Sequence, residues 1–125
     1  MKTIINSRNA PEPIGPYSQA VLVKDTLYVS GQIPVDPTWN SLVTGSIEKE
    51  THQVMANIEA ILKEANMNLH NVVKCSIFVK DLNDFAEVNE VYGSYFEKNP
   101  PARECVEVAR LPKDVNVEIS CIACK

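Results

Sequence analysis

The sequence predicts an α+β fold in which about six strands form one sheet and two helices cover one of its faces. Segments rich in β-branched and aromatic residues alternate with two segments whose apolar residues recur at helical spacing, in the order strand, hairpin, helix, strand, helix, hairpin. Two helices cannot cover both faces of a sheet of that width. One face is therefore expected to meet solvent or another subunit, and we expect function there.

The first predicted hairpin follows a proline-rich loop. Residues 11–16 are expected to form an ordered loop, because proline fixes φ and Gly15 allows a tight bend. Residues 20–24 and 27–30 are both rich in strand-forming residues and are separated by a two-residue turn at 25–26. This spacing predicts an antiparallel hairpin.

Two amphipathic helices are predicted, one over about 46–66 and one from 83 or 84 to 96. Ser46 can cap the first helix, because its hydroxyl can accept a hydrogen bond from a free backbone N–H. The apolar stripe of the first helix consists of Val54, Ile58, Ile61, Leu62 and Ala65. The predicted buried side of the second helix consists of Phe85, Val88, Tyr92, Tyr95 and Phe96.

Three strands are predicted in the second half of the chain. Residues 72–79 form a run rich in valine, with isoleucine and phenylalanine. Two further runs, 102–109 and 115–123, flank a turn signal of Leu-Pro-Lys-Asp at 111–114. This arrangement predicts that the chain ends in a second hairpin.

Alternation along that last hairpin assigns its side chains to faces. Val106 and Val108 share one side, opposite to Arg103, and Ile119 lies opposite to Glu118. If the three apolar residues lie under the helices, Arg103 and Glu118 share the uncovered face, about 15 Å apart at ~3.3 Å per residue. That separation is too large for one small ligand within a protomer, whereas a closed ring could place one subunit's Arg103 against the next subunit.

Length and charge limit the class of protein. With 125 residues, 45% of them hydrophobic, the chain is expected to form one domain over 1–125. A net charge of −4 disfavours nucleic-acid binding, which depends on Lys and Arg contacts with phosphates. No apolar run reaches the ~18 residues of a membrane span, and residues 6–9 are too polar for a signal-peptide core. We therefore expect a soluble cytoplasmic protein.

The four cysteines, Cys75, Cys105, Cys121 and Cys124, fit reduced thiols of the cytosol better than a disulfide framework. Cys121 and Cys124 have Cys-x-x-Cys spacing, but an offset of three along a strand points them to opposite faces. No second Cys or His pair stands at ligand spacing, so we expect no metal site.

Arg103 stands at the start of an otherwise mostly apolar strand, where a fixed positive charge needs a carboxylate partner. The partner could belong to a bound ligand, or it could be Glu107 or Glu118 in an ordinary salt bridge. Glu118 could equally be a solvated strand residue, and Tyr17 a packing residue. Cys105 suggests a nucleophile near a cation, although no neighbouring base is evident.

Several short motifs follow one another along nearly the whole chain. They are Gly15-Pro16-Tyr17-Ser18-Gln19-Ala20, Ser30-Gly31-Gln32, Asp81-Leu82-Asn83-Asp84-Phe85 with Val88-Asn89-Glu90, Pro101-Ala102-Arg103, Val106-Glu107-Val108-Ala109 with Leu111-Pro112-Lys113, and Val117-Glu118-Ile119. In these motifs the sequence resembles the RidA (YjgF-type) family of small imine and enamine deaminases. Because all of them occur in the same order, the resemblance is more specific than any single motif.

The resemblance implies a chorismate-mutase-like fold and a homotrimer whose sheets line a central barrel, with clefts at the subunit boundaries. It also implies a hydrolase that needs no metal or cofactor, namely a 2-iminobutanoate/2-iminopropanoate deaminase. Such an enzyme converts 2-imino acids to 2-oxo acids and ammonia. Its substrates arise from enamines such as 2-aminoacrylate, which pyridoxal-phosphate dehydratases release.

The resemblance further implies roles for individual residues. Arg103 would grip the substrate carboxylate, and Glu118 would position the hydrolytic water. The implied substrate-binding positions are Tyr17, Ser30, Gly31, Asn89, Arg103 and Cys105. Two features depart from the family pattern: Ser120 stands where members often carry a second glutamate, and the connection around Trp39 is longer than the usual turn.

Other classes of function remain open. The same cleft could belong to a non-catalytic module that senses 2-oxo acids or related small carboxylates. A role as endoribonuclease or translation inhibitor has been attached to the family, but the acidic charge and the lack of a catalytic histidine pair argue against it. The two histidines, His52 and His70, are expected in the first helix and in the loop after it. A pure chaperone role would not depend on Arg103.

Overall fold

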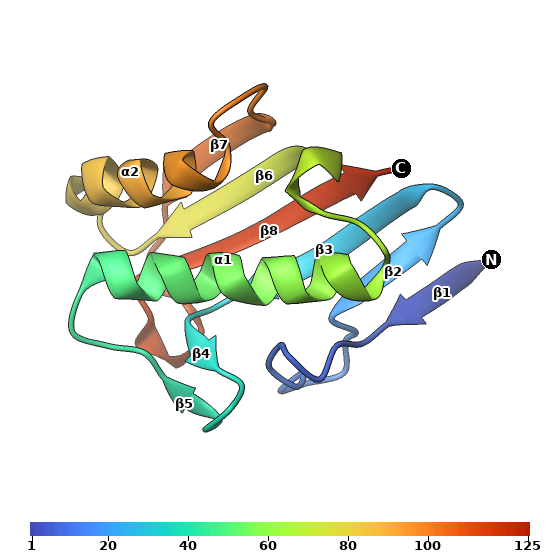
Figure 1. The fold of residues 1–125 in the computed structure, drawn as a ribbon. Helices are drawn as coiled ribbons and strands as arrows, with labels where there is room; N and C mark the ends of the chain where they lie inside the picture. Colours follow the sequence, from blue (N-terminus) through green and yellow to red (C-terminus); the bar gives the residue numbers. More distant parts are fainter.

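The computed structural model describes residues 1–125 and shows an α+β fold in which two helices, α1 (Ile47–Glu64) and α2 (Phe85–Tyr95), pack on one face of a six-stranded sheet (Figure 1). The strands of this sheet are β1 (Lys2–Ile5), β2 (Ala20–Val23), β3 (Thr26–Gln32), β6 (Val72–Val79), β7 (Ala102–Glu107) and β8 (Val117–Cys124). A separate short hairpin, absent from the sequence prediction, consists of β4 (Val35–Asp36) and β5 (Ser41–Leu42). Three 3-10 turns are η1 (Leu69–Asn71), η2 (Leu82–Asp84) and η3 (Pro112–Asp114).

The strand order is β1-β2-β3-β8-β6-β7, so the predicted C-terminal hairpin is wrong. β7 pairs in parallel with β6, and β8 lies antiparallel between β3 and β6. A parallel pair needs a crossover connection, and α2 supplies it. Residues 111–114 therefore belong to a longer loop that carries the chain from the edge strand past β6 to the middle of the sheet (Figure 1).

Several other elements agree with the sequence prediction. The hydroxyl of Ser46 caps α1 by accepting a hydrogen bond from the backbone N–H of Lys49 at 3.1 Å. β2 and β3 form the predicted hairpin, with its turn one residue earlier, at Lys24 and Asp25. The apolar stripes of both helices pack against the inward side chains of β3, β6 and β8 and form the core.

Two buried polar side chains of α1 anchor loops next to the sheet. The amide of Asn57 donates a hydrogen bond to the carbonyl of Val35 at 3.0 Å, which holds the chain just after β3. The carboxylate of Glu50 accepts one from the side-chain amide of Asn116 at 2.8 Å, which holds the chain just before β8. One end of the antiparallel β3–β8 pair is thus fastened to α1 through both of its strands.

The second face of the sheet carries no helix (Figure 1). Tyr28 and Val106 are 49% and 42% exposed there. The same face carries an ion pair between Lys74 Nζ and Glu104 Oε1 at 2.9 Å, and the hydroxyl of Ser76 also donates to Glu104. The open face is therefore mixed in polarity rather than uniformly apolar.

All four cysteines are free thiols. Cys121 belongs to the buried core, and Cys124 is only partly buried, in agreement with the opposite faces that their offset along β8 predicts. No helix combines the length and the apolar content that a membrane crossing requires.

Candidate functional site

Arg103 lies near the start of β7, the edge strand of the sheet, with its guanidinium against α2. Its Nη1 donates a hydrogen bond to Asn89 Oδ1 at 2.6 Å. Its Cζ lies 5.5 Å from the ring centroid of Phe85 and 5.2 Å from that of Tyr92. Two of the predicted site residues, Arg103 and Asn89, are therefore in direct contact.

Arg103 points to the helix-covered side of the sheet, so its predicted place on the open face is wrong. It is the register partner of Cys75 in β6, and Cys75 is buried beneath the helices. Val106, which was expected under the helices, is instead exposed on the opposite face. The reason is that β7 is the edge strand of the sheet, where the hydrophobic core ends. A side chain on its helix-covered side can therefore carry a charge, and a valine on its other side can remain exposed.

The guanidinium adjoins a hollow of about 320 Å³, here called the arginine hollow. Its lining consists of Asn89, Tyr92, Gly93, Phe96, Pro100, Pro101 and Arg103. The two prolines can precede β7 because an edge strand does not need every backbone N–H. Neither ion pair of the protein involves Arg103, so the salt bridge to Glu107 or Glu118 that the sequence left open is not formed. The guanidinium is free to bind an anion from outside the protomer.

Glu118 lies in the central strand β8 and faces the open side, between the fully buried Val117 and Ile119. It borders a hollow of about 350 Å³, here called the glutamate hollow. This hollow is lined by Ile14, Tyr17, Ser30, Gly31, Ile33, Pro112 and Glu118. Four of the predicted site residues, from three separate parts of the sequence, thus meet around one space.

The side chain of Glu118 packs directly on the backbone of Gly31. A Cβ atom at position 31 would lie 2.5 Å from Oε2 and 2.8 Å from Cδ of Glu118, so only glycine leaves room for the carboxylate. Burial raises the pKa of Glu118 above its ordinary value. A carboxylate in this state is a stronger proton acceptor than one in water.

The loop that carries Tyr17 is anchored by the buried side chain of Gln19. Gln19 Oε1 accepts a hydrogen bond from the N–H of Ser7 at 2.6 Å, and Nε2 donates to the carbonyls of Ser7 and Pro11, each at 3.0 Å. The backbone N–H of Ser30 donates to the carbonyl of Gln19 at 2.9 Å. Tyr17 itself is 48% exposed, so its ring is available to a ligand or a neighbouring chain.

The two hollows lie on opposite faces of the sheet within one chain. Glu118 is the register partner of Phe78 in β6, and Arg103 is that of Cys75, so the two residues are two strands and three positions apart. With ~4.8 Å between strands and ~3.3 Å per residue, their Cα atoms are about 14 Å apart. One protomer cannot present both groups to the same small ligand.

Cys105 lies on the same face of β7 as Arg103 and is half-buried. Burial raises the pKa of its thiol above the usual value, although the charge of Arg103 acts in the opposite direction. The thiol therefore stays protonated at neutral pH, which argues against a nucleophilic role. Ser120, which departs from the family pattern, lies two residues beyond Glu118 on the same face but does not line the glutamate hollow.

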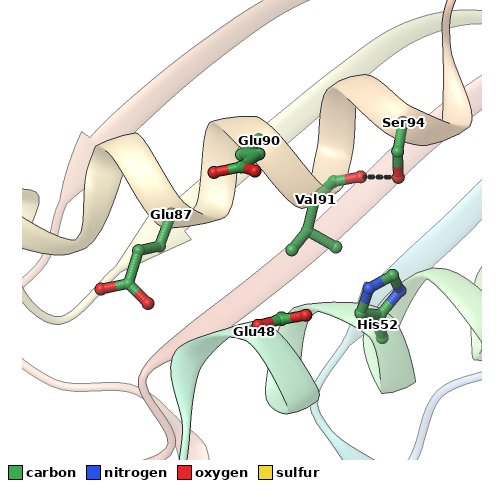
Figure 2. A pocket seen from close by; sticks show the side chains of 6 residues that line it. All are labelled: Glu48, His52, Glu87, Glu90, Val91 and Ser94. Atoms are coloured by element: carbon green, nitrogen blue, oxygen red, sulfur yellow. Dashed lines mark hydrogen bonds between the residues drawn. The ribbon is translucent and has the colours of Figure 1, made fainter.

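A third hollow, of about 250 Å³, lies between α1 and α2 and contains none of the predicted site residues (Figure 2). It is lined by Glu48, His52, Glu87, Glu90, Val91 and Ser94. Figure 2 shows the three carboxylates around this space, and none of them takes part in an ion pair. Unpaired carboxylates repel an anionic substrate, so this hollow is a poor candidate for binding small acids.

The sequence reasoning assigned Phe85 and Tyr92 to the core and missed their contact with Arg103. Tyr92 is buried, but Phe85 is 37% exposed, and both rings face the guanidinium. Phe85, Asn89 and Tyr92 are four and three residues apart, so they share one face of α2. The presence of a polar Asn89 within an aromatic stripe is the signal that could have identified them.

Comparisons with known proteins show the family of this chain. The model of the endoribonuclease L-PSP family matches residues 7–125. A RutC family protein of Pyrococcus horikoshii is 52% identical over 125 residues, which cover 100% of this chain and 99% of that protein. The human 2-iminobutanoate/2-iminopropanoate deaminase is 46% identical over 123 residues, which cover 98% of this chain and 90% of that protein.

The fold also matches solved structures. The crystal structure of TdcF of Escherichia coli with bound serine aligns with a TM-score of 0.94 and 40% identity, over 98% of each chain. The matched part of the chain includes every residue that lines the arginine and glutamate hollows. The matched range therefore spans the candidate site as well as the scaffold.

Proposed function

The chain belongs to the endoribonuclease L-PSP family, the family of YjgF and RidA, and on that premise we propose that it is a 2-iminobutanoate/2-iminopropanoate deaminase. It hydrolyses small 2-imino acids to 2-oxo acids and ammonia in the cytoplasm. Human and bovine relatives that carry this name are 46% and 48% identical to it. The free cysteines are consistent with a reducing compartment.

One observation carries the proposal. The chain presents a guanidinium in the arginine hollow and a desolvated carboxylate in the glutamate hollow, and neither forms an ion pair within the protomer. A 2-imino acid offers a complement to both groups, because it joins a carboxylate to a C=N carbon that water must attack. The chemistry of the substrate thus uses both hollows at once.

Arg103 binds the substrate carboxylate through two parallel charge-assisted hydrogen bonds. A lysine cannot reproduce this geometry, since its ammonium is a point charge without a planar fork. Asn89 accepts a hydrogen bond from one N–H of Nη1 and holds the guanidinium in place. The remaining in-plane N–H groups are sufficient for two-point binding.

Glu118 accepts a proton from water while the water oxygen forms a bond to the imine carbon and the imine nitrogen takes up a proton from bulk solvent. The resulting carbinolamine then collapses: its hydroxyl gives its proton to bulk solvent, the C–N bond breaks, and the protonated Glu118 passes its proton to the departing nitrogen. The products are ammonia and the 2-oxo acid, and the carboxylate is regenerated. Imines hydrolyse without help, so positioning and one acid/base group, worth about 10²–10⁴-fold, suffice.

Assembly brings the two hollows together. Because Arg103 and Glu118 lie on opposite faces of one sheet, we propose that the protein forms a homotrimer in which each cleft combines the arginine hollow of one protomer with the glutamate hollow of the next. A head-to-tail ring joins two different surfaces in this way and closes without free ends. The exposed open face of the sheet then lines the centre of the ring.

The test couples the protein to a dehydratase that releases 2-aminoacrylate or its four-carbon homologue, and follows the decay of the imine by its ultraviolet absorbance. We expect faster decay than in buffer, and loss of that acceleration in Arg103→Ala and Glu118→Gln. Wild-type protein that leaves the decay rate at the buffer value contradicts the proposal. RNA hydrolysis that survives Arg103→Ala would be independent of this site.

A carboxylate sensor is the second candidate function. It is favoured by the structure of TdcF with bound serine, a relative that holds a small molecule with a carboxylate. Binding of 2-oxobutanoate, measured by calorimetry, without any acceleration of imine decay would identify a sensor. Binding together with acceleration would identify the deaminase.

A further inference from the structure

Arg103 is held in place without any carboxylate. Its contacts come from one face of α2, where Phe85, Asn89 and Tyr92 form what is here called the arginine cradle. Two aromatic rings and one neutral amide make up this cradle, whereas a buried or half-buried arginine usually has an acidic partner. The way in which the charge is held is therefore unusual and calls for a physical reason.

The cradle leaves the plane of the guanidinium accessible. Phe85 and Tyr92 are seven residues apart, which is about 10.5 Å along a helix, and Cζ of Arg103 lies 5.5 Å and 5.2 Å from their ring centroids. Both rings thus lie within cation–π distance of the guanidinium, and each attracts a cation to its face. Hydrogen bonds of guanidinium lie in its plane, so the rings do not compete with a carboxylate for the N–H groups.

The cradle also preserves the positive charge. The amide oxygen of Asn89 accepts one hydrogen bond but carries no net charge. A carboxylate in its place would neutralise the guanidinium and would reduce its attraction for a substrate anion. Neither ion pair of the chain includes Arg103, so the full charge is available.

The ring of Tyr92 is the most deeply buried part of the cradle. It is 4% exposed and packs against Phe96 with ring centroids 4.9 Å apart. Its hydroxyl is buried next to the thiol of Cys75 without a hydrogen bond of ordinary geometry, and burial raises the pKa of Tyr92 above its usual value, so the residue stays neutral. The ring and not the hydroxyl is therefore the part of Tyr92 that serves the site.

We infer that Phe85, Asn89 and Tyr92 are positioning residues that hold Arg103 with its plane open and its charge uncompensated, so that the only carboxylate it can pair with is that of the ligand. This inference rests on the proposed function for the identity of the ligand as a 2-imino or 2-oxo acid. The substrate carboxylate is unchanged by the reaction, so it interacts equally with Arg103 in the ground state and in the transition state. Loss of the cradle should therefore raise KM and leave kcat nearly unchanged.

The sharpest test is Asn89→Asp, which keeps the shape and the hydrogen bond but adds the missing negative charge. We expect KM for 2-iminobutanoate and the Kd for 2-oxobutanoate to rise about tenfold or more, while the protein becomes no less stable. Asn6→Asp makes the same change in net charge at an exposed position near β1, on the far edge of the sheet, and should alter neither constant. Unchanged binding by Asn89→Asp would overturn the inference.

The aromatic part of the cradle is tested with Tyr92→Leu and Tyr92→Phe. Leucine removes the ring, and we expect KM and Kd to rise about fivefold, whereas phenylalanine keeps the ring and should restore both constants. Tyr95→Leu makes the same substitution on α2 at a ring that contacts His52 and not Arg103, and it should leave KM unchanged. Equal defects in Tyr92→Leu and Tyr92→Phe would overturn this part.

If Tyr92→Leu fails to fold, Phe85→Leu provides the same test, because it truncates the second, partly exposed ring of the cradle. It should likewise raise KM. The binding readout separates this inference from the proposed function. If the wild-type protein binds 2-oxobutanoate but does not accelerate imine decay, the deaminase proposal fails while Asn89→Asp still tests the cradle. If the wild-type protein does neither, both are wrong.

Discussion

The carboxylate of Glu118 rests on the backbone of Gly31, in a space that a single methyl group would fill. A Cβ at position 31 would approach Oε2 to 2.5 Å, Cδ to 2.8 Å and Cγ to 3.1 Å. The atoms in the way belong to a side chain and not to backbone, so the side chain could move aside without unfolding the sheet. Glycine at this position therefore determines where the carboxylate points.

Gly31→Ala is expected to displace Glu118 and lower kcat for imine hydrolysis about tenfold or more, with little change in the thermal melting temperature. A double-mutant cycle with Glu118→Gln provides the control. If Gly31 acts through Glu118, alanine at 31 has no further effect on activity once the carboxylate is gone. Additive losses of activity would show that Gly31 has another role.

The pH dependence of the reaction should report the raised pKa of Glu118. The residue must be ionised to accept a proton from water, and burial raises its pKa. As pH falls, kcat/KM is expected to decline at a pH above about 4.3, the ordinary value for glutamate. The measurement is a kcat/KM profile corrected for the uncatalysed rate. An acid limb at or below the ordinary value would contradict this assignment.

The same rise in pKa predicts a change in stability. Glu118 ionises at a lower pH in the unfolded chain than in the folded protein. Its contribution to the free energy of unfolding is therefore fully present below the unfolded pKa and is lost as pH rises through the folded pKa. Glutamine stays neutral and avoids this loss. Glu118→Gln should therefore melt at a higher temperature than wild type near pH 7, and the gain should disappear near pH 4. A variant that is less stable at both values would indicate a structural role for the carboxylate.

Gln19 should be important for stability as well as for the Tyr17 loop. Gln19→Leu leaves the buried backbone groups that this amide satisfies, at Ser7 and Pro11, without partners. We expect the free energy of unfolding in urea to fall by about 2–4 kcal/mol. Asn83→Leu, at an exposed side chain, serves as the control and should change stability by less than about 0.5 kcal/mol. A similarly small loss in Gln19→Leu would mean that water replaces the amide.

Local signals in the sequence were sufficient for most elements of the fold. Ser46 caps α1 as expected, and β6 spans the predicted residues 72–79, because capping chemistry and short-range periodicity determine both. The order of strands depends on long-range pairing, which these signals do not contain. The Leu-Pro-Lys-Asp turn shows that the chain bends there, but not that β8 inserts between β3 and β6.

The same limit explains what was predicted of the site. The chemistry of Arg103 and Glu118 could be inferred from residue type, whereas their faces could not, since the assignment required knowing which strand lies at the edge. Phe85 has the spacing of a core residue, and only the position of β7 beside α2 turns its ring towards a charge. Contacts between protomers could not be predicted from these local signals either, because both hollows open at the surface of a single protomer and whatever closes them lies outside it.

Mixing two inactive variants tests whether neighbouring protomers share a site. Arg103→Ala retains the glutamate hollow, and Glu118→Gln retains the arginine hollow. In a head-to-tail ring of three, every ring that contains both variants has one boundary where an intact Arg103 faces an intact Glu118. Random assembly then restores about a quarter of the wild-type sites.

Coexpression of the two variants with different affinity tags allows mixed rings to be purified and assayed. Imine hydrolysis near the expected fraction is predicted for the mixture, while each variant alone remains at the buffer rate. The control pairs either variant with the doubly substituted chain, a mixture in which no boundary can be complete. Confirmed mixed rings without activity would contradict a shared cleft, because the separation of about 14 Å across one sheet leaves no site within a single protomer for either variant to restore.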